Sequence, residues 1–177
     1  MTVLVFDGHD GSGKTSLARR VAELCGASYA RPFGGERGER LFALASAGFY
    51  DEANRHALEC VRDAQSGGGA TVFDRHWMTA FTLLPEAYWE AWSPLPRTIL
   101  CRTDVDTTLS RLAQREVRGA GEDSHERWIA KYGSLAARFN CEVLDTTQTD
   151  IDETARMLVA RLDKLRLQAM EPPVSPA

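Results

Sequence analysis

The sequence lacks the features of several large protein classes. None of its apolar runs approaches the roughly 20 residues that a membrane-spanning helix needs. Hydrophobic residues make up 44% of the chain and charged residues 26%, values that exclude a disordered, collagen-like or coiled-coil protein. The segment from Met1 to Phe6 has no basic flank and is too short for a signal peptide. We therefore expect a globular protein of the cytoplasm that does not engage a membrane.

The sequence also has few cysteines and lysines, and its net charge is negative. The four cysteines lie far apart and form neither a CxxC pair nor a cluster with histidine, which argues against a disulfide framework or a zinc site. The net charge of −4 argues against a dedicated nucleic-acid binder, and so against a polynucleotide kinase. Lys14 is one of only three lysines in a chain rich in arginine, so its position is informative.

Short apolar segments alternate with longer amphipathic ones along the chain. Strands are expected at 2–6, 27–30, 70–73, 97–101 and 142–144. Helices are expected at 14–25, 37–47, 50–65, 77–92, 107–118, 125–139 and 150–169, with Asp106 and Asp150 as candidate N-caps. Because the strands do not alternate between apolar and polar residues, we expect an α/β fold. It would have a mostly parallel five-stranded sheet and helices on both faces.

The strongest motif is the run from Gly8 to Thr15, GHDGSGKT, which matches the phosphate-binding pattern GxxxxGK[ST] in full. It follows a predicted strand and opens a predicted helix, where backbone N–H groups and the helix dipole both favour an anion. Lys14 would reach the β- and γ-phosphates of ATP, and the Thr15 hydroxyl would ligate Mg²⁺. The expected ATP-binding residues of this segment are Gly8, Asp10, Gly11, Ser12, Gly13, Lys14, Thr15 and Ser16.

The rest of the chain narrows the kind of P-loop protein. The DxxG and NKxD segments of GTPase switches are absent from the sequence. Asp7, Asp74 and Asp145 each follow a predicted strand, at the sheet edge where ligands bind in such folds. Asp74 is a candidate magnesium ligand, and Arg75 offers a planar fork for phosphate. Length and motifs together suit a small kinase.

At these residues the sequence resembles the thymidylate kinase and deoxynucleoside kinase branch of the P-loop nucleoside monophosphate kinases, over about residues 1 to 165. The motif from Phe6 to Thr15 is similar to the first motif of that branch, and the resemblance implies that Asp10 contacts the sugar of the acceptor. The sequence DRH at 74–76 resembles the DR[YHS] motif. That resemblance implies that Asp74 helps to hold Mg²⁺ and that Arg75 bridges the acceptor and transferred phosphates.

Other segments extend the resemblance. By position, Arg31 would meet the acceptor phosphate and Arg55 would read the acceptor base. Arg111 and Arg115 fall in a segment like the lid helix of the family, and we expect them to close on ATP. The family also places an amide after DR[YHS] to read thymine, and residues 78–84 contain none. Thymine specificity is therefore less well supported than the fold and phosphoryl transfer.

We therefore expect a three-layer P-loop kinase domain over residues 1–169, with a short lid at about 111–123 and a flexible tail over 170–177. The expected reaction is ATP- and Mg²⁺-dependent phosphoryl transfer to a nucleoside monophosphate, with Lys14, Arg75, Asp10 and Arg115 as catalytic residues. Asp7 or Asp10 would orient the acceptor. A hydroxyl acceptor on a nucleoside or other metabolite, a regulatory nucleotide-binding domain, and a homodimeric assembly remain open.

Overall fold

A computed structural model describes residues 3–65, 67–114 and 122–170. It contains a five-stranded sheet in the order β2-β3-β1-β4-β5. The strands are β1 (Val3–Asp7), β2 (Ser28–Ala30), β3 (Thr71–Asp74), β4 (Arg97–Arg102) and β5 (Glu142–Asp145). Every neighbouring pair is parallel, so the predicted α/β fold is confirmed and the sheet is wholly rather than mostly parallel.

Within the described residues there are seven α-helices, of which six connect the strands and the last follows β5. They are α1 (Lys14–Cys25), α2 (Glu36–Ser46), α3 (Tyr50–Gln65), α4 (Trp77–Leu83), α5 (Val105–Ala113), α6 (Glu122–Arg138) and α7 (Ile151–Met170). A 3₁₀ helix, η1, spans Glu86–Trp92. None of the helices in the described ranges is long and apolar enough to cross a membrane.

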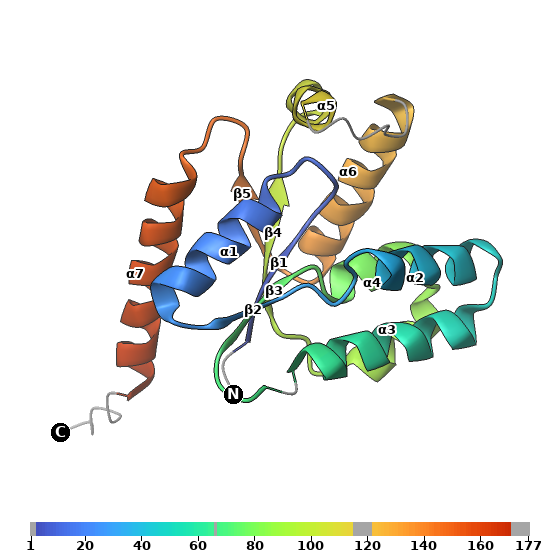
Figure 1. Ribbon diagram of the computed structural model, residues 1–177, viewed down its shortest axis with the longest axis horizontal. Helices are drawn as coiled ribbons and strands as arrows, with labels where there is room; N and C mark the ends of the chain where they lie inside the picture. The colour runs from blue at the N-terminus through green and yellow to red at the C-terminus, as the bar shows by residue number, and fades with distance from the viewer. Residues whose placement is uncertain (1–2, 66, 115–121, 171–177) are drawn as a thin grey trace.

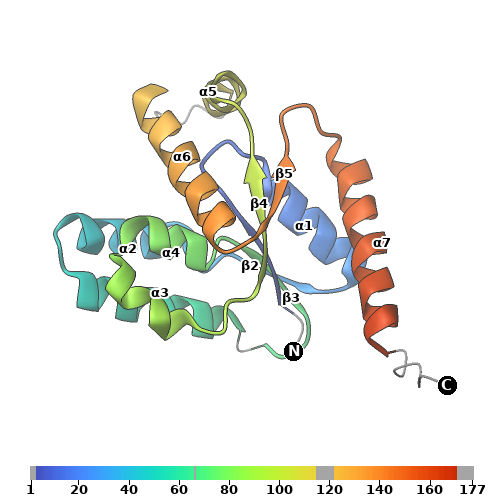
Figure 2. The same cartoon turned by 180° about the vertical axis from the view of Figure 1, so that it is seen from behind.

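The helices form a layer on each face of the sheet, as the sequence predicts. Helices α1 and α7 lie together on one face, and α2, α3, α4 and α6 lie on the other (Figures 1 and 2). The first layer closes a core around Leu4, Phe6, Val21, Ile99 and Leu158. The second closes a larger, aromatic core that includes Trp77, Phe81 and Trp92. Burial of these apolar side chains on both faces explains why the strands read as continuous hydrophobic runs.

Two predicted helices differ from the observed ones. The single helix expected at 77–92 is split, because Pro85 cannot continue a helix and forces Leu84 into an extended conformation with ψ of 144°. Helix α5 begins at Val105, and its N-cap is Asp104 rather than Asp106. The Asp104 carboxylate accepts a hydrogen bond from the Thr107 backbone N–H at 2.6 Å. The predicted N-cap at Asp150 is confirmed, with a 2.8 Å bond from the Glu153 N–H.

Parts of two expected segments lie outside the described residues. The predicted lid at 111–123 includes 115–121, and almost all of the predicted tail at 170–177 is likewise outside. The other loops that follow the strands gather at the carboxyl edge of the sheet, where the loop between β1 and α1 lies beside the ends of β3 and β4. This edge carries the candidate site.

Candidate active site at the carboxyl edge of the sheet

The P-loop from Gly8 to Thr15 connects β1 to α1 and is shaped by glycine. Gly8 has φ of 145°, and a Cβ atom there would lie 2.3 Å from the Cys101 carbonyl oxygen of β4, so no other residue fits. Gly13 is the N-cap of α1 with a left-handed φ of 75°. Its carbonyl accepts the Leu17 N–H at 3.2 Å. The loop therefore presents its curved backbone and the N-terminus of α1 to one point at the sheet edge, as an anion site requires.

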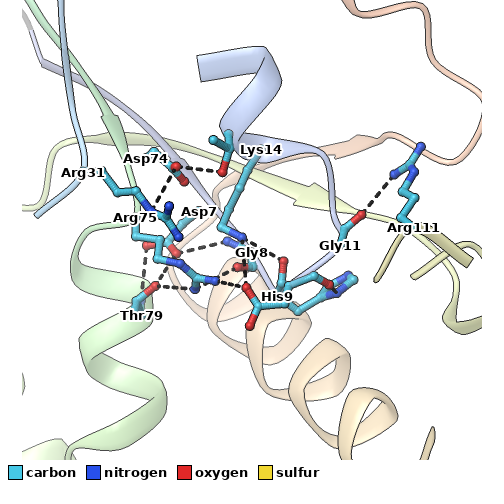
Figure 3. A network of polar contacts seen from close by, with 12 residues as sticks. Asp7, Gly8, His9, Gly11, Lys14, Arg31, Asp74, Arg75, Thr79 and Arg111 are labelled. Atoms are coloured by element: carbon cyan, nitrogen blue, oxygen red, sulfur yellow. Dashed lines mark hydrogen bonds and ion pairs between the residues drawn. The ribbon is translucent and has the colours of Figure 1, made fainter. Parts of the chain in front are cut away.

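Lys14 lies inside this loop with only 4% of its surface exposed. Its Nζ donates to the His9 carbonyl at 3.0 Å and lies 3.9 Å from the Asp10 carboxylate (Figure 3). Burial, assisted by the nearby Arg75 charge, lowers the pKa of Lys14 to about 8. A buried ammonium group at the centre of an anion-binding loop is suited to bind phosphate oxygens.

Asp74 at the end of β3 is fully buried. One of its carboxylate oxygens contacts two hydroxyl donors and one guanidinium group. Oδ2 accepts hydrogen bonds from the Thr15 hydroxyl at 2.7 Å and the Tyr29 hydroxyl at 2.9 Å, and lies 3.6 Å from Arg31 Nε. Oδ1 is buried and has no hydrogen-bond partner. A carboxylate with one uncommitted oxygen beside a threonine hydroxyl fits a hard divalent cation. Within the described residues no three His, Cys, Asp or Glu groups form a metal cluster, so such an ion would need oxygens from phosphate and water.

Arg75 follows β3 and connects the P-loop to two helices. Its Nη2 donates to the Asp10 carboxylate, and its Nη1 lies 3.3 Å from both the Gly8 carbonyl and the Tyr132 hydroxyl of α6. Burial alone would lower the pKa of Arg75, but Tyr132 and the nearby carboxylates raise it above its ordinary value. Its backbone has φ of 76°, a left-handed conformation that is uncommon outside glycine. Arg75 is therefore charged and held in one position against Asp10.

Asp10 and Asp7 have different environments although both were candidates to orient the acceptor. Asp7 is fully buried and accepts four hydrogen bonds: from the backbone N–H groups of Gly8, His76 and Thr79 at 3.0, 2.9 and 3.2 Å, and from the Thr79 hydroxyl at 2.7 Å. Burial raises the pKa of the Asp7 carboxyl, while Thr79 and Arg75 oppose that rise. These bonds fasten β1 to the start of α4.

Asp10, by contrast, exposes 69% of its side chain. Partial burial raises its pKa, but Arg75 and Lys14 outweigh that effect and hold it below the usual value. Asp10 is therefore a charged carboxylate that a ligand can reach, whereas Asp7 is enclosed.

A cavity of about 500 Å³ opens beside the P-loop on the α2, α4 and α6 side of the sheet. Asp10, Arg31 and Arg75 line it together, so the structure brings these three predicted residues to one place. Apolar and aromatic side chains form much of the remaining wall, among them Phe33, Leu41, Phe42, Leu112, Trp128 and Tyr132. A cavity of this size with a few converging charged groups is typical of a small-molecule site.

A second, smaller cavity of about 140 Å³ lies on the other side of the P-loop, and Gly13, Ser16 and Arg111 line it. Arg111 donates to the Gly11 carbonyl at 3.2 Å and to the Thr146 carbonyl at 2.7 Å. The Thr146 hydroxyl in turn donates to the Ser12 carbonyl at 2.7 Å. Arg111 therefore joins the P-loop to the segment after β5 and borders a cavity that lies along the P-loop.

One predicted site residue is not brought to this edge, and another lies outside the described residues. Arg55 is exposed on α3 and is absent from the described lining of the larger cavity. Arg115 lies outside the described residues. Sequence reasoning also missed Tyr29, Thr79 and Tyr132, which hold Asp74, Asp7 and Arg75. No local signal marks them, because each contacts a partner more than 40 positions away.

The comparisons with known proteins agree with this geometry at the level of the fold. No model of a known family matches the sequence, and no curated protein matches it. Among solved structures, the chain is similar to the YorR protein from Bacillus subtilis in complex with phosphorylated GDP (TM-score 0.66, 14% identity, 94% of this chain and 98% of that chain covered).

Two further solved structures have the same fold. One is shikimate kinase from Acinetobacter baumannii in complex with shikimate (TM-score 0.64, 15% identity, 94% and 96% covered). The other is deoxyadenosine kinase from M. mycoides with the products dCMP and a flexible dCDP bound (TM-score 0.59, 13% identity, 93% and 100% covered). The chain has the P-loop kinase fold, with a complete P-loop at the carboxyl edge of its parallel sheet.

Proposed function

We propose that the protein transfers the γ-phosphoryl group of ATP to a small-molecule acceptor, and that the acceptor is a nucleoside monophosphate. The observation that carries this proposal is the shared wall between the P-loop and the 500 Å³ cavity, where Arg75 and Asp10 form one ion pair. A donor bound in the P-loop and an acceptor in the cavity would meet at this pair. Catalysis would be mainly positioning and charge neutralisation.

The donor side is formed by the P-loop and its neighbours. Lys14 would bind the β- and γ-phosphates, Ser16 and Arg111 would border the nucleotide, and residues 111–123 would form the lid over it. Thr15 and Asp74 would hold Mg²⁺, because the Asp74 Oδ1 atom is buried without a partner beside the Thr15 hydroxyl. When bound, the ion neutralises charge on the phosphates.

The acceptor side contains two cations, Arg31 and Arg75, and two carboxylates, Asp10 and the exposed Glu39. Arg31 has 44% of its side chain exposed and lines the cavity, so its guanidinium can reach an anionic acceptor. Guanidinium binds phosphate through two parallel hydrogen bonds, which supports a phosphate-bearing acceptor. A second candidate is a neutral acceptor with a reacting hydroxyl, and the exposed Asp10 carboxylate favours it because such an acceptor benefits from a base.

The experiment is a coupled ADP-release assay on matched pairs of nucleoside and nucleoside monophosphate. We expect the monophosphate to be preferred by about a hundredfold in kcat/KM, which corresponds to two charge-assisted hydrogen bonds. Arg31→Ala should remove about tenfold of that preference, whereas Arg37→Ala, an exposed α2 arginine paired with Asp63, should not. A wild-type preference for the uncharged partner would establish the hydroxyl-acceptor alternative.

The remaining proposals concern the whole protein. We place it in the cytoplasm on the strength of its dispersed cysteines, with residues 1–169 acting as one kinase domain that can assemble as a homodimer.

A further inference from the structure

The acceptor cavity contains two buried imidazoles whose outer nitrogens have no partner. His9 belongs to the P-loop and is 3% exposed, and His125 belongs to α6 and is 5% exposed. Both residues line the cavity, and the Nε2 atom of each is buried without a hydrogen bond. A buried polar atom without a partner is costly, so its presence on a cavity wall indicates a group that a ligand supplies.

The chemistry of the His9 nitrogen follows from its contacts. Its Nδ1 lies 2.8 Å from the Asp10 carbonyl oxygen, which can only accept, so Nδ1 carries the proton and Nε2 carries a lone pair. Burial lowers the pKa of His9 to about 4, and the nearby Lys14 and His125 act in the same direction. His9 is therefore neutral at pH 7, and its ring is directed away from Asp74 (Figure 3).

Several other polar groups of the cavity wall are already engaged, while the Glu39 carboxylate on the same wall is exposed to solvent. Tyr132 and Thr79 bond each other at 2.9 Å, the Thr82 hydroxyl donates to the Thr79 carbonyl at 2.7 Å, and Asp10 is paired with Arg75. In the described part of the lining, the two imidazole nitrogens are the only buried side-chain nitrogen or oxygen atoms without a partner. They are therefore the buried groups of the wall that remain to recognise an uncharged part of the acceptor.

These groups favour a ligand that donates hydrogen bonds. A lone pair on His9 repels carbonyl and phosphate oxygens but accepts from an N–H group. The ring of His125 can accept in the same way, and a primary amino group has two N–H bonds to give. Trp128 and Phe33 on the same wall offer aromatic faces for a planar ring.

We propose that His9 and His125 select nucleotide acceptors whose base carries an exocyclic amino group. The inference rests on the proposed function, because it takes this cavity as the acceptor site. A base with only carbonyl groups at that position leaves one imidazole nitrogen facing another lone pair, and discrimination of this kind by unpaired polar groups is strong in binding sites.

The test measures the dissociation constants of CMP against UMP and of AMP against IMP, by titration calorimetry on the ADP-bound protein. We expect CMP and AMP to bind about tenfold more tightly than their partners, the size expected for two neutral hydrogen bonds at the weak end of their range. His9→Phe and His125→Phe should each reduce that ratio to about threefold or less. His9→Gln and His125→Gln should retain more of it, because the glutamine Oε1 can stand in for Nε2.

Two controls separate recognition from loss of structure. His56→Phe removes an imidazole of α3 that bonds the Arg37 carbonyl outside the cavity, and it should keep the wild-type ratio. The affinity for ADP should be unchanged in the His125 and His56 variants, which lie outside the P-loop, and this verifies that the donor site is intact in them. Equal binding of both members of each pair, binding of none of the four nucleotides, or phenylalanine variants that keep the ratio would overturn the inference.

The ADP-release assay distinguishes this failure from failure of the proposed function. Turnover of any acceptor without a preference for the amino member leaves the kinase proposal in place and removes the role of the imidazoles. Selective binding of CMP and AMP without transfer to any acceptor would support the role of the imidazoles and remove the kinase proposal.

Discussion

Lys14 carries a charge that the proposed reaction uses, and burial of that charge lowers the stability of the fold. Lys14→Met should reduce turnover by about a thousandfold or more, because a cation at the transferred phosphoryl group is lost. The same change should raise the free energy of unfolding at pH 7 by about 2–3 kcal/mol, because it removes a buried charge whose pKa is lowered from 10.5 to about 8.

The pH dependence of that difference provides the check. Below pH 8 Lys14 is protonated in the folded and the unfolded chain, so burial of its charge lowers the stability of the wild type by the full amount. Between pH 8 and 10.5 only the unfolded chain keeps the proton, so the wild type gains stability as the pH rises. Urea unfolding should show that the difference in free energy of unfolding between Lys14→Met and the wild type is smaller at pH 10 than at pH 7. A variant that is less stable than the wild type at pH 7 contradicts the argument.

Asp74 can be tested separately from the P-loop lysine. Asp74→Asn keeps the shape of the side chain but removes one negative charge, so the Mg²⁺ concentration for half-maximal rate should rise by about tenfold. Asp104→Asn is the matched control, since asparagine caps α5 as well as aspartate does and Asp104 makes its cap bond to Thr107 rather than to Thr15. Superimposable magnesium titrations for wild type and Asp74→Asn would assign Asp74 a purely structural role.

The residues of the site were predictable to different degrees. The P-loop from Gly8 to Thr15 is a contiguous string whose conformation is imposed by its glycines, so the sequence alone indicates an anion site. Asp74 and Arg75 could be placed because they directly follow a buried strand. Tyr132 could not, because its position depends on how α6 packs across the sheet, and no periodicity in the sequence encodes that packing.

Among the helices, too, some could be predicted from the local sequence and others could not. The helices at 14–25 and 50–65 have a clear apolar stripe and were predicted within a residue or so of α1 and α3. The prediction of a single helix at 77–92 was wrong, because the spacing of its aromatic residues suits both one α-helix and two shorter helices broken at Pro85. The interruption matters for the site, since α4 supplies Thr79 and Thr82 to the cavity wall.

Helix α5 offers a prediction of its own. Asp104→Ala should lower the free energy of unfolding measurably, because it removes the bond to the Thr107 N–H at the helix start. Asp106→Ala, two residues later, should have an effect of less than about 0.5 kcal/mol. Urea denaturation of both variants decides between them, and equal losses would show that Asp104 is not the cap. Helix α5 also carries Arg111, so the affinity for ATP should fall slightly with Asp104→Ala.

Across the whole molecule, the alternation of strands and helices was enough to predict an α/β sheet with its ligands at the carboxyl edge. The parallel order β2-β3-β1-β4-β5 places the loops after β1 and β3 side by side, which brings the P-loop to Asp74 and Arg75. The 500 Å³ cavity could not be predicted, because its wall combines α2, α4 and α6 with the P-loop. Those contacts arise only when the helical layer is assembled.

The stability of the molecule should depend on His76, which is buried against Phe73 and Trp92 and has no partner for either ring nitrogen. Burial lowers its pKa to about 4 from 6.5. The unfolded chain therefore takes up a proton first as the pH falls from 6.5 to 4, and folding stability is lost over that window. His76→Phe should remove about 2–3 kcal/mol of this loss.

Urea midpoints measured from pH 7.5 to pH 4 test this expectation. The wild type should lose stability steeply below pH 6.5, and His76→Phe should have the shallower profile, with the slope that remains coming from His9 and other groups. Parallel profiles for the two proteins would show that His76 keeps its ordinary titration in the fold.

The left-handed backbone of Arg75 has a consequence for laboratory evolution. A non-glycine residue at φ of 76° costs on the order of 1–3 kcal/mol, whereas glycine adopts this conformation freely. A library at position 75 that is screened for heat resistance alone would therefore enrich glycine over alanine, and one screened for phosphoryl transfer would return arginine. Enrichment of glycine in one screen and of arginine in the other would show that the residue that suits the backbone at position 75 differs from the residue that suits catalysis.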